Sequence, residues 1–249
     1  MSKTVKEMIR HPMEDPDIHF TLLVLNYKLP RFFEYVWSKA DSRVCADGGI
    51  NRVLNYFAEK GVNDYTPPNY VVGDFDSVNQ SVRQSVSEKG CEFIEIHDQD
   101  FNDIEKSLSV ISRYGNTENP VIVLGAYGGR LDHTLAALKA GIIYQKLRIF
   151  YLDDDNFSTW IFPGDKGVIR PNVWTRKTCG LLPAGIPVKH VKTSGLRWNC
   201  DFGLSMHTII SSSNEFADDA EYVEIETSDP ILWTNQAQKY EVIFPNGNI

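Results

Sequence analysis

Two aspartates separated by one residue are the strongest chemical signal in this sequence. Asp74 and Asp76 follow a short apolar segment that ends at Val72. In extended backbone, residues two apart point to the same side, so both carboxylates could bind one cation. Carboxylate oxygens suit Mg²⁺, which usually takes one or two of them together with substrate phosphates. The alternative is a turn in which the aspartates accept local hydrogen bonds and Ser77 caps a helix.

Polar segments also follow three neighbouring apolar segments. They are Asp47-Gly48-Gly49, the run from Asp98 to Asp103, and the run from Gly125 to Thr134. If the apolar segments are strands of a parallel sheet, their carboxyl ends meet at the edge of the sheet where ligands bind. Four acidic strand ends at one edge favour the metal interpretation of Asp74 and Asp76 over the turn.

The segment after the fourth strand has both a structural and a chemical interpretation. Asn102 and Glu105 have the spacing of a helix capping box, which leaves Asp100 and Asp103 unexplained. Asp103 lies one helical turn before Lys106. This pair is either a surface salt bridge of little energetic weight, or a place where Lys106 faces phosphate while the aspartates face metal.

The glycine-rich loop from Gly125 to Arg130 leads into a predicted helix. Glycines let a backbone approach a phosphate, the first N–H groups of a helix attract it, and Arg130 adds a bidentate donor. The loop is neither a Walker A sequence nor the GxGxxG dinucleotide fingerprint, so a tight strand-to-helix turn is an equal alternative. For His133, a role as general base is weaker than a supporting hydrogen bond.

Alternating apolar and amphipathic segments predict that the first half is a mainly parallel, Rossmann-like α/β domain covering residues 1–158. The predicted strands are 21–25, 43–46, 70–72, 92–96, 121–124 and 147–152, and the predicted helices are 29–39, 51–60, 82–89, 103–114 and 131–146. After residue 158, frequent prolines and glycines and the alternating segments 188–191 and 222–227 predict an all-β domain, a β-sandwich covering 159–249.

Composition narrows the functional class. With 33 acidic and 25 basic side chains the formal net charge is −8, which argues against nucleic acid as a partner. The four cysteines form no CxxC pair, so we expect buried free thiols in a reducing compartment. No apolar run is long enough for a membrane span, so a cytoplasmic location is expected. The first 19 residues or so are expected to be a flexible extension.

Taken together, the ordered motifs resemble the thiamine pyrophosphokinase family. In the first half these are DGG at 47–49, GDFDS at 73–77, DQDFND at 98–103 with Lys106, and GGRLDH at 128–133. In the second half they are TSGLRWN at 193–199, SSSNE at 211–215 and PILWT at 230–234. The resemblance covers roughly residues 20 to 235. The sequence departs from the family pattern at Asn102, at Ile104-Glu105 and at Arg197, and none of these departures removes a carboxylate.

The resemblance implies an ATP-binding α/β domain, a thiamine-binding β-sandwich, and a homodimer whose active sites are shared between subunits. It implies transfer of a diphosphate from ATP to the thiamine hydroxyl, with Mg²⁺ as cofactor and AMP as product. The catalytic residues it implies are Asp74, Asp76, Asp100, Asp103, Arg130 and Asp132, of which Asp74, Asp76 and Asp103 hold the metal. The ATP-binding residues it implies are Asp47, Gly48, Gly49, Gln99, Lys106, Gly128, Gly129 and Arg130.

For thiamine, the resemblance points to Ser213 and Asn214 as polar contacts, and to Trp198 and Trp233 as aromatic neighbours of the cationic ring. A tryptophan in a β-domain is more often a core residue than a ligand platform. Two other functions remain open at this point. One is a different Mg²⁺-dependent nucleotide hydrolase or nucleotidyltransferase, and the other is a thiamine-binding protein without catalysis, which would not need the acidic cluster.

Overall fold

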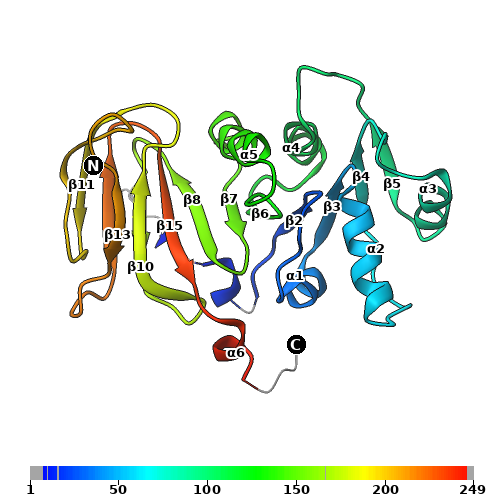
Figure 1. Ribbon diagram of the computed structural model, residues 1–249, viewed down its shortest axis with the longest axis horizontal. Helices are drawn as coiled ribbons and strands as arrows, with labels where there is room; N and C mark the ends of the chain where they lie inside the picture. The colour runs from blue at the N-terminus through cyan, green and yellow to red at the C-terminus, as the bar shows by residue number, and fades with distance from the viewer. Residues whose placement is uncertain (1–7, 10, 16, 166, 246–249) are drawn as a thin grey trace. The chain divides into compact units, whose positions relative to one another are not determined.

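The computed structural model describes residues 8–9, 11–15, 17–165 and 167–245, and the chain divides into two compact units (Figure 1). The first unit runs from His19 to Asp153. The second contains the described part of residues 8–18 together with the chain from Asp154 onward. The change of unit lies between Asp153 and Asp154.

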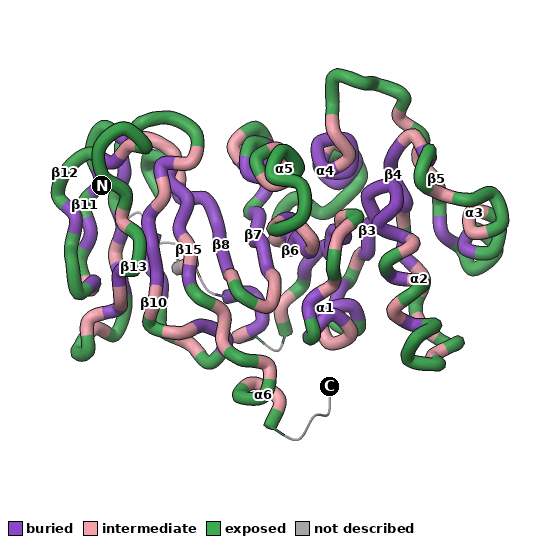
Figure 2. The backbone as a smooth tube through the Cα atoms, viewed as in Figure 1, coloured by how far each residue is buried: buried purple, intermediate pink, exposed green. Residues whose placement is uncertain are grey.

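The first unit is built on a parallel sheet, as predicted. Its strands are β2 (Thr21–Val24), β3 (Ser42–Ala46), β4 (Tyr70–Gly73), β5 (Glu92–Glu95), β6 (Val121–Leu124) and β7 (Ile149–Leu152). They lie in the order β7-β6-β2-β3-β4-β5, and each neighbouring pair is parallel. Every residue of β2, β6 and β7 is buried, which explains their continuous apolar sequences (Figure 2).

Helices connect these strands. They are α1 (Phe33–Lys39), α2 (Gly49–Glu59), α3 (Gln80–Ser87), α4 (Asp103–Tyr114) and α5 (Leu131–Ile143). Right-handed crossovers place α1 and α2 on one face of the sheet, and α4 and α5 on the other (Figure 1). The connections after β2 and β6 therefore leave in opposite directions, which makes the carboxyl ends of these two strands the switch point of the sheet.

The predicted helices are all present. The helix predicted at 103–114 has these ends, and the others differ at one or both ends by a few residues. The first begins at Phe33 rather than at residue 29, because Pro30 favours a turn, in which its carbonyl accepts a hydrogen bond from Phe33 N at 3.0 Å. The second begins at Gly49, directly after the Asp47-Gly48 turn. Thus the acidic and glycine segments lie where strands end and helices start.

The second unit is rich in β-strands, as predicted, and these strands form two groups. Its strands after the change of unit are β8 (Asn156–Ile161), β9 (Gly167–Ile169), β10 (Thr175–Leu182), β11 (Val188–Ser194), β12 (Asp201–Leu204), β13 (Ser211–Glu215), β14 (Val223–Thr227) and β15 (Ile231–Ala237). Within this unit, β13-β10-β15-β8 form one antiparallel arrangement, and β9-β14-β11-β12 form the other. A short helix, α6 (Tyr240–Ile243), follows the last strand.

The segment before the first unit is part of the second one. Strand β1 (Met8–Ile9) pairs in parallel with β9, and the turn η1 (Pro12–Glu14) follows it. His11 is buried and stacks on Trp174 with 5.4 Å between the ring centroids and 7° between the planes. The expectation of a flexible extension is therefore wrong for these residues, because an aromatic contact and strand pairing hold them. Residues 1–7 lie outside the described residues.

The cysteines are free and buried, as expected from their spacing. Among the residues that the structure describes, no helix has the length and apolar character needed to span a membrane.

Candidate active site

Three carboxylates gather at the carboxyl edge of the parallel sheet. One ligand oxygen from each of Asp47, Asp74 and Asp76 lies within 4.8 Å of the other two. Asp47 follows β3, and Asp74 and Asp76 follow β4, so adjacent strands deliver the group. Asp74 and Asp76 were predicted as metal ligands, whereas Asp47 was predicted to contact ATP. The structure brings all of them together.

The backbone that presents these carboxylates is not extended. Strand β4 ends at Gly73, and Phe75 has a φ of 63°, while Asp47 has a φ of 40°. Both residues lie in the left-handed region, which is costly for side chains other than glycine and concentrates at functional sites. The pairing of Asp74 with Asp76 thus results from a left-handed turn at Phe75. The interpretation from extended backbone gave the right neighbours for the wrong reason.

Asp47 is the most enclosed member of the cluster. Its residue is 3% exposed, and its Oδ1 atom accepts no hydrogen bond from the described residues. Burial raises the pKa of Asp47, hydrogen bonds from Ser77 and Gly48 oppose this shift, and the charges of Asp76 and Asp74 add to it. A buried carboxylate with an unused oxygen and acidic neighbours is a group that a cation would satisfy.

Lys106 provides a buried cation beside the cluster. Its Nζ lies 3.3 Å from Asp74 Oδ2 and 3.9 Å from Asp103 Oδ1, and its side chain is 3% exposed. Gln99 Nε2 also donates to Asp74 Oδ2 at 3.3 Å. Partial burial acts to raise the pKa of Asp74, but the hydrogen bonds from Lys106 and Gln99 lower it below its usual value. Lys106 and Gln99 thus keep Asp74 ionised.

Asp103 stands next to this group at the start of α4. Burial and the charge of Asp47 raise its pKa, Lys106 opposes them, and Asp74 and Asp76 contribute further. The charges of the acidic cluster therefore act on Asp103. The third carboxylate of the close group is Asp47, whereas the sequence predicted Asp103.

The start of α4 is fixed by the predicted capping box. Asn102 Oδ1 accepts a hydrogen bond from Glu105 N at 3.1 Å, and Glu105 Oε2 accepts one from Asn102 N at 3.3 Å. The Glu105 carboxylate is buried, and its Oε1 meets Lys139 Nζ of α5 at 3.0 Å. Cap and ion pair together hold the helix turn that carries Asp103 and Lys106.

The glycine-rich loop after β6 packs around the ring of Tyr27. Gly128 and Gly129 have φ values of 90° and 64°, and a Cβ added to either would lie 2.8 or 2.6 Å from that ring. Only glycine fits such positions. Arg130 ends this loop and donates to both carboxylate oxygens of Asp132, at 3.1 and 2.6 Å. These hydrogen bonds lower the pKa of Asp132, and both side chains are exposed.

Asp100 lies apart from the tight group. It is exposed, and its backbone N–H donates to Asp98 Oδ1 at 2.9 Å. Asp98 and Asp100 thus form a local turn in which a side-chain oxygen accepts a backbone hydrogen bond.

In the second unit, Asn214 supports the turn that carries Trp198. Asn214 Nδ2 donates to the Trp198 carbonyl at 2.8 Å, and Trp198 N donates back to Asn214 Oδ1 at 3.3 Å. Asn214 is 3% exposed, whereas Trp198 is 54% exposed and lies under the guanidinium of Arg197 at 4.7 Å. Trp198 has the exposure that a ligand platform needs, and Asn214 holds its backbone in place.

A bulge in β13 directs Asn214 inward. Cys179 of β10 pairs with Asn214, and Leu181 pairs with Ser211. An interval of two residues on β10 therefore faces an interval of three residues on β13. Ser213 within this bulge has a φ of 57° and is exposed. Bulges of this kind re-aim side chains next to functional sites.

Trp233 has a different environment from Trp198. It is fully buried, its Nε1 donates to Asn235 Oδ1 at 2.7 Å, and Phe216 packs edge-on against it. Its environment within the chain is therefore that of a core residue with a satisfied N–H group, and we do not retain it among the proposed thiamine contacts.

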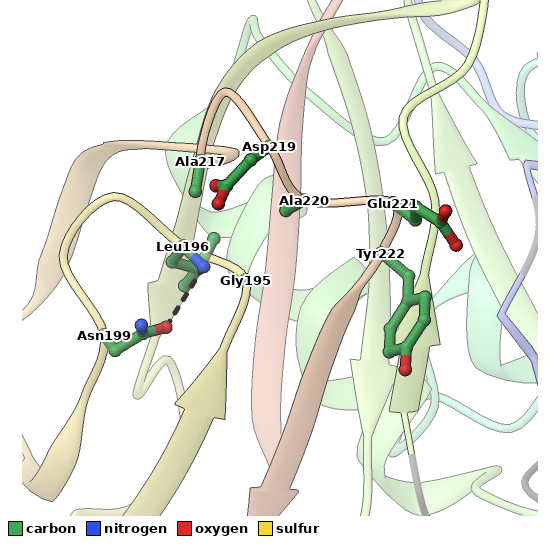
Figure 3. A pocket seen from close by; sticks show the side chains of 8 residues that line it. All are labelled: Gly195, Leu196, Asn199, Ala217, Asp219, Ala220, Glu221 and Tyr222. Carbon is green, nitrogen blue, oxygen red and sulfur yellow. Dashed lines mark hydrogen bonds between the residues drawn. The ribbon is translucent and has the colours of Figure 1, made fainter.

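A pocket of about 530 Å³ opens beside the turn after β11 (Figure 3). Asn199 Oδ1 accepts from Leu196 N at 3.1 Å and closes the turn on one side of it. The residues that line the pocket are Gly195, Leu196, Asn199, Ala217, Asp219, Ala220, Glu221 and Tyr222. The four side chains predicted for thiamine are not among them.

Sequence reasoning missed the end of the central strand. Tyr27 follows β2 and supports Gly128 and Gly129, and Asn26 lies against Gly48, where an added Cβ would come within 2.3 Å of its Nδ2. The signal was available, because the rule that was applied to the later strand ends applies equally to Asn26 and Tyr27.

Comparison with known proteins shows the family to which the chain belongs. The family model described as "Thiamin pyrophosphokinase, catalytic domain" matches residues 33–151, and "Thiamin pyrophosphokinase, vitamin B1 binding domain" matches residues 167–232. Thiamine pyrophosphokinase 1 of Oryza sativa subsp. japonica is 34% identical over 244 residues, which is 90% of this chain and 89% of the relative. Thiamine pyrophosphokinase 2 of Arabidopsis thaliana is 32% identical over 88% of this chain and 87% of its own.

Solved structures show the same fold. Thiamin pyrophosphokinase from Candida albicans superposes with a TM-score of 0.81 at 25% identity, covering 96% of this chain and 95% of that one. Yeast thiamin pyrophosphokinase superposes with a TM-score of 0.81 at 23% identity, covering 94% and 92%. The family models match residues on both sides of the change of unit, and the relatives align along nearly the whole chain. The chain therefore belongs to the thiamine pyrophosphokinase family.

Proposed function

We propose that residues of the first unit bind Mg²⁺ and ATP, and that residues of the second bind thiamine, in the diphosphate transfer that characterises the family. The reaction is the ATP-dependent transfer of a diphosphate group to the hydroxyl of thiamine, which gives thiamine diphosphate and AMP. The observation that carries the site assignment is the group formed by Asp47, Asp74 and Asp76, with a buried oxygen of Asp47 that the described residues leave unsatisfied.

The donor set fits Mg²⁺. Carboxylate oxygens from two adjacent strands are hard ligands. Burial raises the pKa of Asp47, and the charges of Asp76 and Asp74 add to this shift, so a bound cation would relieve both effects. Asp47, Asp74 and Asp76 would hold the ion, with Asp103 beside them. When bound, Mg²⁺ neutralises negative charge on the reacting phosphates.

The positive groups at the same edge would orient the ATP phosphates. Lys106 lies against the acidic cluster, and the backbone of Gly128 and Gly129 leads to Arg130 at the start of α5. Phosphoryl-type transfer depends mainly on positioning and on neutralising charge, so these groups supply what the reaction needs. Asp132 would orient Arg130 through its two hydrogen bonds. Asp100 is proposed to accept the proton of the thiamine hydroxyl.

For thiamine, the match of the vitamin B1 binding domain to residues 167–232 supports a site in the second unit. Trp198 would stack on the cationic ring, and Ser213 would offer a hydroxyl. Asn214 would act through Trp198, because its polar atoms are engaged with that backbone. We also propose a homodimer with active sites shared between subunits, and a cytoplasmic location.

Separating the products of a reaction tests this function. Purified protein is mixed with ATP, Mg²⁺ and thiamine, and the products are resolved by anion-exchange chromatography. Thiamine diphosphate with one equivalent of AMP is expected, and Asp76→Asn should yield neither. Formation of ADP or free phosphate instead would contradict the proposal, as would Mg²⁺-independent turnover.

A further inference from the structure

We propose that Arg52 is a further ATP-binding residue, held by Asn26 so that its guanidinium meets the triphosphate. This inference rests on the proposed function of the sheet edge. Arg52 lies in the first turn of α2 and is exposed, and its Nε donates to Asn26 Oδ1 at 3.0 Å. The contact fixes the direction of the side chain and leaves the two terminal nitrogens of the guanidinium available.

The location of this pair is the switch point of the sheet. Asn26 and Tyr27 lie two and three residues after Val24, the last residue of the central strand β2. Asn26 lies against Gly48 of the Asp47–Gly49 turn, and Tyr27 lies against Gly128 and Gly129 of the loop after β6. The two residues thus bridge the loops that flank the crevice in which doubly wound sheets bind nucleotides.

Arg52 has no acidic partner among the described residues, unlike the two other cations proposed to bind the ATP phosphates. Lys106 is paired with Asp74, and Arg130 is paired with Asp132. In the part of the chain that the structure describes, Arg52 meets only the neutral amide of Asn26 and has no carboxylate partner. In a chain of net charge −8, a positioned guanidinium without a protein anion fits a ligand anion.

The ligand class follows from the guanidinium itself. Its planar fork suits phosphate oxygens, to which it donates in a bidentate manner. A polyphosphate is a better match than a carboxylate substrate. The acidic cluster at the same edge repels an anion that carries no cation, whereas a polyphosphate arrives with bound Mg²⁺ that the carboxylates can ligate.

Substitution of Arg52 tests the inference. Arg52→Gln should raise the KM for ATP and the dissociation constant of ATP in calorimetric titration, each about tenfold. The KM for thiamine should stay within about twofold. Arg52→Lys should recover part of the loss, because it restores the charge but not the fork. Asn26→Ala should weaken ATP binding less, and its effect should largely vanish when Arg52 is already Gln, since Asn26 acts through Arg52.

Arg113→Gln is the matched control, since Arg113 is an exposed arginine in the last turn of α4 and should leave ATP binding unchanged. Unchanged ATP binding by Arg52→Gln would overturn the inference. Suppose that Arg52→Gln binds ATP normally, while Arg130→Gln weakens ATP binding and the wild type makes thiamine diphosphate. Arg52 is then not an ATP-binding residue, and the proposed function still holds. If the wild type binds ATP but makes no thiamine diphosphate, the proposed function fails, and the titrations still decide the role of Arg52.

Discussion

Asp47 combines burial, a left-handed backbone and two acidic neighbours in one residue. Its raised pKa means that the folded state resists its ionisation. For an acid whose pKa is higher in the folded than in the unfolded state, stability is lost as the pH rises through that interval. At neutral pH the ionised carboxylate therefore costs stability, and a bound cation would restore it.

Asp47→Asn tests this balance without disturbing the backbone, because asparagine tolerates a positive φ. Without divalent cations, the variant should melt at a higher temperature than the wild type. Mg²⁺ at about 100 times its dissociation constant should stabilise the wild type by about 2.7 kcal/mol and the variant by less than half of that. Differential scanning fluorimetry with EDTA and with Mg²⁺ measures both effects.

Asp64→Asn, an exposed aspartate after α2, is the control and should respond to Mg²⁺ as the wild type does. An equal Mg²⁺ response in wild type and Asp47→Asn would remove Asp47 from the metal site.

At this scale the sequence predicted residue types better than their geometry. Asp74 and Asp76 were expected near the other acidic strand ends because strand ends of a parallel sheet converge, whereas Lys106 was left between a surface salt bridge and a phosphate contact. The third carboxylate of the tight group was not predicted to be Asp47, because its position depends on a left-handed residue. No local pattern marks a non-glycine residue for that conformation, and the same holds for Phe75.

Among the elements, β13 shows how a local irregularity serves a distant turn. Its bulge turns Asn214 inward, where it holds the Trp198 backbone. Asn214→Ala removes both hydrogen bonds to that backbone. The KM for thiamine should rise about tenfold, with the KM for ATP unchanged, because only the turn is displaced. Steady-state kinetics with each substrate varied in turn measures this split.

Asn235→Ala is the matched comparison, because Asn235 is a buried asparagine of the same unit that accepts from Trp233. It should lower the melting temperature and leave the KM for thiamine unchanged. If Asn214→Ala behaved in the same way, its role would be stability alone.

Elements with a clear period were predictable, and those defined by pairing were not. The strands and helices of residues 19–153 follow from alternating apolar and amphipathic segments, and the capping box of Asn102 and Glu105 was visible in the spacing. The pairing of β1 with β9 joins residues about 160 positions apart. Two-residue strands carry no periodic pattern, so this contact leaves no trace in the sequence.

At the level of the whole chain, the N-terminal segment introduces a pH dependence. Burial lowers the pKa of His11 to about 3, whereas an unfolded histidine titrates near 6.5. Protons therefore bind preferentially to the unfolded state below pH 6.5, and stability is lost as the pH falls from there. Between pH 7 and pH 5 the loss attributable to His11 is about 2 kcal/mol.

Urea unfolding of the wild type and of His11→Phe at pH 7 and pH 5 measures this loss. The phenylalanine ring keeps the contact with Trp174 and cannot be protonated, so the variant should lose about 2 kcal/mol less on acidification. Substitution by Gln of the exposed His207, in the turn between β12 and β13, should leave the pH dependence unchanged. If His11→Phe lost as much stability between pH 7 and pH 5 as the wild type does, the result would show that the segment opens before His11 is protonated.

The pairing of β1 with β9 also makes the second unit discontinuous along the chain, because residues 19–153 are inserted between its two parts. A ribosome synthesises the N-terminal end first, so Met8 and Ile9 leave the exit tunnel long before their partner strand exists. The α/β unit is contiguous and can fold as soon as it emerges, whereas the β unit must wait for its final strands. The order of assembly during translation is therefore the reverse of what the position of β1 in the chain would suggest.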